Sequence, residues 1–174
     1  AEVSDAILRY YRMLPTGLDL PLASQKGMRV SLIRRFFSEQ LEFINIAKNY
    51  IEILDFHDIL QNVIYTSESQ GKLGGKTAGL FLAKQILKKS GDPDLLGNVK
   101  TPKTWYITSD VVKYFMEYNN LEGVVEQKYK DVNQVRLEYP HIMQTFKNAH
   151  FPPEIVKGLS VALDDFKDKP LIVR

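Results

Sequence analysis

The residues with the clearest chemical potential lie between positions 71 and 83, where the chain reads Gly-Lys-Leu-Gly-Gly-Lys-Thr-Ala-Gly-Leu-Phe-Leu-Ala. The paired glycines Gly74 and Gly75 run into Lys76, which opens an apolar stretch with helical spacing. A glycine backbone can approach an anion closely because it has no Cβ, and the first amides of a helix lack partners within the helix. The segment is therefore typical of a site that holds phosphate groups. The alternative is a glycine-rich turn that only leads into a helix.

The P-loop, a widespread phosphate-binding motif, has a different spacing. It reads Gly-x-x-x-x-Gly-Lys-Ser/Thr. Counted back from Gly75, its first glycine would stand at position 70, which is Gln70. Residues 62–69 also have a polar second half and make a poor buried strand. A P-loop-like nucleotide binder, with a complete Mg-ATP site in this chain alone, is therefore the weaker alternative.

Other candidate sites have simpler explanations. His57, His141 and His150 are widely spaced, with no second histidine or carboxylate at metal-ligand spacing, so we expect no metal site. Asp110 follows a short apolar segment, as a magnesium ligand would, but an aspartate at a helix start is the better interpretation. Arg34 and Arg35 are expected on the solvated face of a helix.

The composition excludes several classes of protein. The 23 basic and 21 acidic residues leave a net charge of only +2, which argues against a dedicated binder of nucleic acid or membrane surfaces. The absence of cysteine excludes disulfides, thiolate metal sites and cysteine nucleophiles. Without a membrane-spanning apolar run or a signal-peptide pattern, we expect a cytoplasmic protein.

Most of the elements that must position these residues are predicted helices. Apolar periodicity and capping signals predict helices over residues 3–14, 29–53, 55–60, 76–89, 109–118 and 153–166. Asp55 is the expected cap of the short helix that ends near Leu60, and Thr108 or Ser109 that of the helix at 109–118. In the 76–89 helix, the residues expected to face inward are Leu80, Ala83, Ile86 and Leu87. Residues 121–149 look helical, with a break predicted near Tyr139 because Pro140 lacks an amide donor.

A few short strands complete the predicted fold. Residues 61–66 and 72–73 are expected to form a small two-stranded element, and 105–108 and 171–174 are predicted strands. The fold class is α+β and mostly helical, with a helical N-terminal extension at 1–60 packed on an α/β part at 61–174. A chain rarely ends where a buried strand delivers an arginine, so we expect a fragment of a longer protein.

Three segments, in order, resemble the nucleotide-binding domain of the pyruvate phosphate dikinase and phosphoenolpyruvate synthase family. Gly-Gly-Lys-Thr-Ala-Gly-Leu at 74–80 resembles the family's Gly-Gly-Lys-x-x-x-Leu opening, and 102–110 is similar to its Pro-x-Gly-Phe-x-Ile-Thr-Thr stretch. Phe-Pro-Pro-Glu-Ile at 151–155 and Leu-Ile-Val-Arg at 171–174 are similar to its Leu-Pro-Pro-Glu helix and terminal Val-Arg. The resemblance covers about residues 60–174. Lys-Thr at 103–104 departs from the family pattern.

The resemblance implies the first part of an ATP-grasp-like domain, in which ATP lies between two subdomains. In the family, the lysine after the paired glycines and the arginine of the Val-Arg motif contact the nucleotide phosphates. These positions are Lys76 and Arg174 here, and the predicted ATP contacts are Gly74, Gly75, Lys76, Thr108 and Arg174. Lysine would supply a mobile charge and arginine a planar fork for two oxygens. None of the five is a predicted catalytic residue.

The resemblance also implies that the reaction needs more than this chain. The family's magnesium-binding acidic residues, phosphohistidine domain and pyruvate-binding barrel lie beyond the Val-Arg motif. We therefore expect part of the ATP-binding domain of an ATP-dependent phosphotransferase, inactive alone, with ATP and the remaining domains of the parent protein as partners. The alternative from a different class is a noncatalytic helical interaction module that forms a homo-oligomer through the 29–53 helix.

Overall fold

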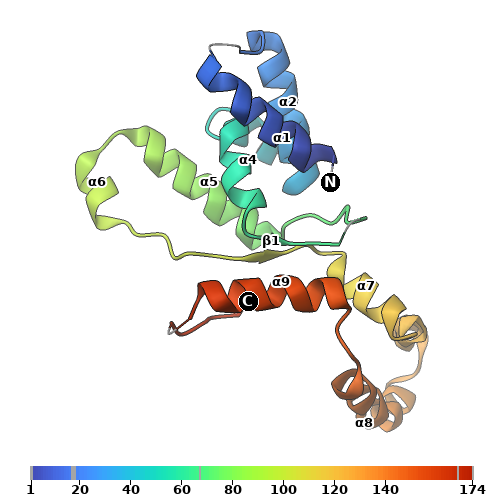
Figure 1. Ribbon diagram of the computed structural model, residues 1–174. Coiled ribbons are helices and arrows are strands. Elements are labelled where there is room, and N and C mark those ends of the chain that lie inside the picture. The colour runs from blue at the N-terminus through green and yellow to red at the C-terminus, as the bar shows by residue number, and fades with distance from the viewer. Residues whose placement is uncertain (1, 17–18, 67, 168, 174) are drawn as a thin grey trace. The chain divides into compact units, whose positions relative to one another are not determined.

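The computed structural model describes the chain as mostly helical, and the residues it describes are 2–16, 19–66, 68–167 and 169–173 (Figure 1). Among them, two short strands form a small parallel sheet. This architecture confirms the predicted fold class, α+β and mostly helical. The chain forms two compact units, residues 1–109 and residues 110–174.

The first unit begins with a run of helices. They are α1 (Glu2–Met13), the short 3-10 helix η1 (Leu14–Thr16), α2 (Leu22–Phe36), α3 (Leu41–Ala47) and α4 (Ile53–Leu60). The single helix predicted over 29–53 is therefore wrong. The carbonyl of Phe36 accepts the amide of Leu73 at 2.8 Å, and the amide of Gln40 donates to the Ser38 hydroxyl at 3.1 Å. These bonds replace the helical hydrogen bond that would have linked Gln40 to Phe36.

The start of α4 also differs from the prediction. The N-cap residue is Glu52, and Asp55 stands three positions inside the helix. The two residues form a capping box, in which the Asp55 carboxylate accepts the Glu52 amide at 2.8 Å. Asp55 thus stabilises the first turn as expected, but from within the helix.

The two strands come from distant parts of the first unit. β1 (Val63–Ile64) and β2 (Tyr106–Ile107) pair in parallel, with Val63 opposite Tyr106 and Ile64 opposite Ile107. The strand predicted at 105–108 is confirmed, but the expected partner at 72–73 is wrong. Parallel strands require a crossover, and here the connection contains α5 (Gly75–Ser90) and α6 (Pro93–Asn98).

The core of the first unit joins α5 to the helices that precede it. Phe37 links these elements, since its ring centroid lies 5.7 Å from that of Phe56 and 5.3 Å from that of Phe81. Helix α5 buries Ala78, Phe81, Leu82 and Gln85. The predicted inward face is therefore wrong in part, since Leu80 is 48% exposed, Ala83 is exposed, and Ile86 and Leu87 are half-buried. The run Leu-Phe-Leu-Ala at 80–83 offers apolar residues in every direction, so periodicity alone cannot select the buried face.

The second unit is built from α7 (Val111–Tyr118), the 3-10 helix η2 (Glu122–Tyr129), α8 (Val132–Asn148) and α9 (Pro153–Asp165). Asp110 is the N-cap residue of α7, in place of the expected Thr108 or Ser109. The break predicted near Tyr139 is wrong, because α8 continues through Pro140. No residue of α8 is buried, so water can satisfy the carbonyl that Pro140 leaves without a donor.

Two details complete the second unit. Asn119 ties the end of α7 to the segment before α9, since its side chain donates to the His150 carbonyl at 2.9 Å and accepts the His150 amide at 3.0 Å. The strand predicted at the C-terminus is not formed by residues 171–173, which are exposed and unpaired with any strand. Arg174 lies outside the described residues.

Candidate functional site

The paired glycines form the start of α5. Gly74 is the N-cap residue, and its carbonyl accepts the first helical hydrogen bond, from the Ala78 amide at 3.1 Å. The amides of residues 75–77 precede that bond and have no acceptor within the helix. A Cβ placed on Gly74 or Gly75 would meet no other heavy atom within 4 Å. Because Gly74, Gly75 and Lys76 are also exposed, a ligand can approach this turn.

Lys76 adds positive charge to this helix start. Its side chain is exposed, and no hydrogen bond or ion pair with any described residue holds its ammonium group. The first turn of α5 also lacks an acidic residue, the usual partner of a helix N-terminus. Free amides, the helix dipole and the lysine thus act together without a counter-charge from their own turn. This arrangement favours an anion with several oxygen atoms.

The segment that leads into the glycines is anchored on two sides. Leu73 is 2% exposed, and its amide donates to the Phe36 carbonyl at the end of α2. Lys72 donates its amide to the Ser109 hydroxyl at 3.1 Å and accepts the Ser109 amide at 3.0 Å. The Lys72 ammonium also reaches Glu39 Oε1 at 2.7 Å. This hydrogen bond and the lysine's charge lower the pKa of the Glu39 carboxyl group.

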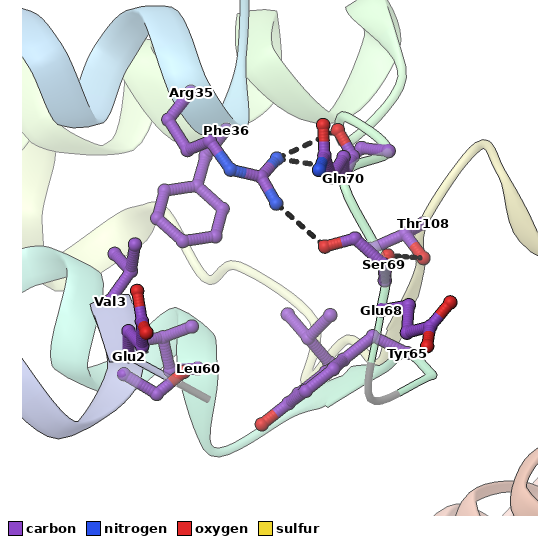
Figure 2. Close-up of a pocket in the computed structure, with 13 residues that line it drawn as sticks. Glu2, Val3, Arg35, Phe36, Leu60, Tyr65, Glu68, Ser69, Gln70 and Thr108 are labelled. Atoms are coloured by element: carbon purple, nitrogen blue, oxygen red, sulfur yellow. Dashed lines mark hydrogen bonds between the residues drawn. The ribbon is translucent and has the colours of Figure 1, made fainter.

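Thr108, the predicted contact at the end of β2, lies against the same segment. It is 5% exposed, and its amide donates to the Ile64 carbonyl at 3.3 Å. Its hydroxyl oxygen accepts a hydrogen bond from the Ser69 hydroxyl at 3.0 Å, as Figure 2 shows. The structure thus brings Thr108 to the loop that precedes Gly74. The sequence did not indicate that this hydroxyl has an internal partner.

Sequence reasoning also missed Arg35. Its guanidinium group donates to the carbonyls of Ser69 and Gln70, each at 2.8 Å, and to that of Gly71 at 3.3 Å (Figure 2). The expectation of a solvated face is correct for Arg34, which is exposed, and wrong for Arg35, which is half-buried. Because the partners lie 34 to 36 positions along the chain, no local pattern could have identified them.

A cavity of about 440 Å³ opens beside this loop. Apolar side chains of Phe36, Leu60 and Val63 form part of its wall, and residues 68–71 line another part. Of the four predicted contact residues that the structure describes, Thr108 lines the cavity, whereas Gly74, Gly75 and Lys76 do not. The start of α5 is thus an open helix end outside the cavity lining, and the fifth predicted contact, Arg174, lies outside the described residues.

Metal ligands are not gathered at this site. Within the described ranges, no group of three or more histidine, aspartate or glutamate side chains is arranged to hold a metal ion. The helix-start amides and the Lys76 ammonium group near the glycine turn are donors of the kind that suit phosphate oxygens. His57 has a packing role, since its ring stacks on that of Tyr11 at 4.5 Å. No described helix is both long and apolar enough to cross a membrane.

Comparison with known families decides the relationship that the motifs indicated. The family model of the pyruvate phosphate dikinase, AMP/ATP-binding domain matches residues 70–174. The chain belongs to this family. The matched part of the pyruvate phosphate dikinase AMP/ATP-binding domain begins at Gln70, so it includes the start of α5 and Thr108 and leaves α1 to α4 outside. No curated protein and no solved structure matches the chain.

Proposed function

We propose that the chain contributes phosphate contacts to ATP, as the N-terminal part of the ATP-binding domain of a dikinase-like or phosphoenolpyruvate-synthase-like phosphotransferase. The observation that carries this proposal is the start of α5, where open backbone donors and a free lysine occur together without an acidic residue. Membership of the family gives ATP as the expected ligand. The phosphates are the part of ATP that this helix start suits.

Each residue has a distinct task in this proposal. Gly74 and Gly75 let phosphate oxygens approach the backbone, and Lys76 neutralises their charge. Thr108 offers a hydroxyl proton at the end of β2, while its oxygen accepts from Ser69. Arg174 is proposed from the family resemblance alone. Phosphoryl transfer depends largely on positioning and on neutralising oxygen charge, so such contacts are the main contribution that a binding wall can make.

The chemistry itself is assigned to the whole parent protein. The described residues hold no metal-binding cluster, so Mg²⁺ would be bound by parts of the parent outside this chain. Mg²⁺ would bridge phosphate oxygens and neutralise charge during transfer. We accordingly propose that this chain binds and orients ATP, is inactive alone, and works with the other domains of a cytoplasmic phosphotransferase.

A charge-removing substitution tests the proposal directly. Millimolar Mg-ATP should shift the amide NMR signals of residues 74–77 in the 174-residue chain, and Lys76→Ala should weaken that binding. Loss of one charge-assisted contact corresponds to roughly 10- to 100-fold in affinity. In the parent phosphotransferase, the same substitution should abolish ATP-dependent phosphorylation.

Lys84 provides the matched control, because it is an exposed lysine of the same helix with no partner among the described residues. Lys84→Ala should bind Mg-ATP like the original chain. Equal losses in the two variants, or signal shifts spread evenly over α5, would contradict a phosphate site at the helix start. Normal phosphorylation by the Lys76→Ala parent would remove Lys76 from the mechanism.

A further inference from the structure

We propose that Arg35, which lies outside the region of family resemblance, is a positioning residue for the phosphate-binding start of α5. The inference rests on the proposed function, because it concerns the same helix start. Three consecutive carbonyls, at residues 69–71, accept hydrogen bonds from one guanidinium group (Figure 2). Few side chains can bind three neighbouring backbone groups at once.

The geometry of arginine explains why the loop depends on this residue. One terminal nitrogen of Arg35 serves the carbonyls of Gln70 and Gly71, and the other serves that of Ser69. Carbonyl oxygens that converge on one point repel one another unless a cation lies between them. The planar guanidinium fork offers several donors in fixed directions and keeps its charge at any physiological pH. Arg35 therefore holds this segment in a curved conformation.

The curved segment is continuous with the glycine turn. Directly after residue 71, Lys72 is bound to Ser109, and Leu73 is bound to the carbonyl of Phe36. Phe36 follows Arg35 in α2, so the end of that helix holds the loop through both its side chain and its backbone. Without Arg35, residues 69–71 would lose their contacts with α2, and the bonds of Lys72 and Leu73 would be left to fix the path into Gly74 and the place of the first amides of α5.

Arg35 acts through the backbone and not as a phosphate ligand. Its two terminal nitrogens are occupied by the loop carbonyls, and its guanidinium carbon lies 5.5 Å from the centre of the Phe36 ring. Arg35 is half-buried where α2 meets the loop, and its contacts hold the backbone of the loop in place. Lys76 remains the exposed cation at the start of α5.

The test compares Arg35→Met and Arg35→Lys with Arg34→Met in the 174-residue chain. Arg34 is the exposed neighbour, so its replacement removes the same charge without touching the loop. The first measurement, without nucleotide, is hydrogen exchange at the hydrogen-bonded amides of Ser69, Lys72 and Leu73. The second is Mg-ATP affinity, followed through the amide signals of residues 74–77.

Arg35→Met should speed exchange at these amides by about tenfold or more. It should weaken Mg-ATP binding by about the same factor. A change of this size corresponds to losing roughly one well-formed hydrogen bond to a charged group. Arg34→Met should change neither quantity. Arg35→Lys should resemble Arg35→Met, since an ammonium group keeps the charge but not the two-armed geometry. A full rescue by lysine would assign the effect to charge and overturn the positioning role.

The measurements separate this inference from the function on which it rests. If the original chain shows no Mg-ATP binding, the proposed function is decided in the parent phosphotransferase, by whether its Lys76→Ala variant loses phosphorylation, and the exchange data decide whether Arg35 holds the loop. If the original chain binds Mg-ATP and Arg35→Met binds it equally well, the positioning role is overturned while the proposed function stands. If Arg35→Met also speeds exchange at Phe56 in α4, Arg35 stabilises the fold in general, and that result would also overturn the positioning role.

Discussion

Lys76 occupies the end of α5 at which a positive charge is least favourable. A helix N-terminus carries the equivalent of about half a positive charge, and a cation there is disfavoured by roughly 0.3–1 kcal/mol. Gly75, the first residue inside the helix, has a lower helix propensity than alanine, whereas glycine is well accepted at the N-cap position of Gly74. Lys76 and Gly75 are therefore poor choices for the fold alone. They are good choices for binding an anion, which is the argument for a functional origin.

Gly75→Ala separates these two requirements. The new methyl group would meet no heavy atom within 4 Å, so the folded chain should tolerate it and gain between zero and about 1 kcal/mol in free energy of unfolding. Mg-ATP affinity should nevertheless fall, because the methyl group stands where a phosphate oxygen would approach. Urea denaturation and the Mg-ATP titration measure the two effects.

Gly79→Ala is the control, since Gly79 is exposed within α5 and has equally open surroundings. It should stabilise the helix by about 1 kcal/mol and leave Mg-ATP affinity unchanged. A Gly75→Ala chain with unaltered affinity would show that the glycine backbone is not in contact with the nucleotide.

At this scale the sequence predicts local chemistry better than long-range contacts. Gly74, Gly75 and Lys76 were placed at a helix start from their types and spacing, and the structure has them there. Arg35 and Ser69 were missed because their partners lie 34 to 39 positions away in the sequence. Whether the predicted residues contact ATP stays a prediction.

At the scale of helices and strands, the sequence-based predictions were wrong where a segment distant in the sequence takes a backbone hydrogen bond. Apolar periodicity runs through residues 29–53, yet Leu73 takes the carbonyl of Phe36 and α2 ends. β1 likewise pairs with a strand beyond α5 and α6, which local patterns cannot identify. The interaction-module alternative was based on an unbroken helix, so the break in the structure removes its motivation.

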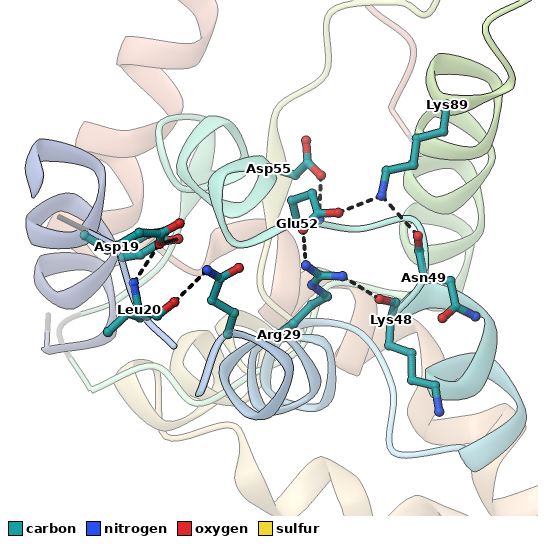
Figure 3. Close-up of polar contacts among 10 residues, drawn as sticks. Asp19, Leu20, Arg29, Lys48, Asn49, Glu52, Asp55 and Lys89 are labelled. Atoms are coloured by element: carbon teal, nitrogen blue, oxygen red, sulfur yellow. Dashed lines mark hydrogen bonds and ion pairs between the residues drawn. The ribbon is translucent and has the colours of Figure 1, made fainter. Parts of the chain in front are cut away.

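A polar network holds the far end of α5 against the earlier helices (Figure 3). The Glu52 carboxylate pairs with Arg29 of α2 and, at 2.6 Å, with Lys89 of α5. Arg29 also donates to the Lys48 carbonyl at 2.9 Å, and Lys89 to that of Asn49 at 3.0 Å. Burial raises the pKa of the nearby Asp55 carboxyl group. The C-terminal end of α5 is thus fixed through Glu52, as its N-terminal end is fixed through the loop.

Glu52→Gln should lower the free energy of unfolding by about 1–2 kcal/mol, because it leaves Arg29 and Lys89 side by side without their shared carboxylate. The Arg29 side chain is only 17% exposed, so water can solvate its charge only in part. Lys89→Met should cost less, since Glu52 keeps Arg29 as a partner. Urea denaturation of both variants gives the comparison.

Glu42→Gln is the matched control, because Glu42 is exposed and, apart from its place in the first turn of α3, has no hydrogen-bond or ion-pair partner among the described residues. It should alter the free energy of unfolding by no more than about 0.5 kcal/mol. A Glu52→Gln chain as stable as this control would show that the network contributes nothing to the attachment of α5.

For the whole molecule, the limits of the family match do not coincide with those of the compact units. The match begins at residue 70, whereas the first unit runs from residue 1 to 109. Its core draws buried residues from Ile7 in α1 to Leu82 in α5. The helical extension and the first matched segment therefore share one core, as the predicted packing of the extension implied. The domain boundary predicted at residue 60 stays a prediction.

A shared core implies that the extension and α5 unfold together. Phe37 is 4% exposed and links the two parts, because its ring lies against those of Phe56 in α4 and Phe81 in α5. Phe37→Ala should lower the free energy of unfolding by about 3–5 kcal/mol. Native-state hydrogen exchange should show α1, α4 and α5 losing protection by the same amount, because the three helices share one core and unfold together.

Phe151→Ala serves as the control from the second unit, where Phe151 is 54% exposed and its ring lies 5.2 Å from that of Phe115. It should leave exchange in α1, α4 and α5 unchanged. If Phe37→Ala loosens α5 while α1 and α4 keep their full protection, the extension is a separate folding unit. If all three loosen together, helix α5 owes its stability to residues that lie outside the family match, and a chain that begins at residue 61 cannot hold the glycine turn in place.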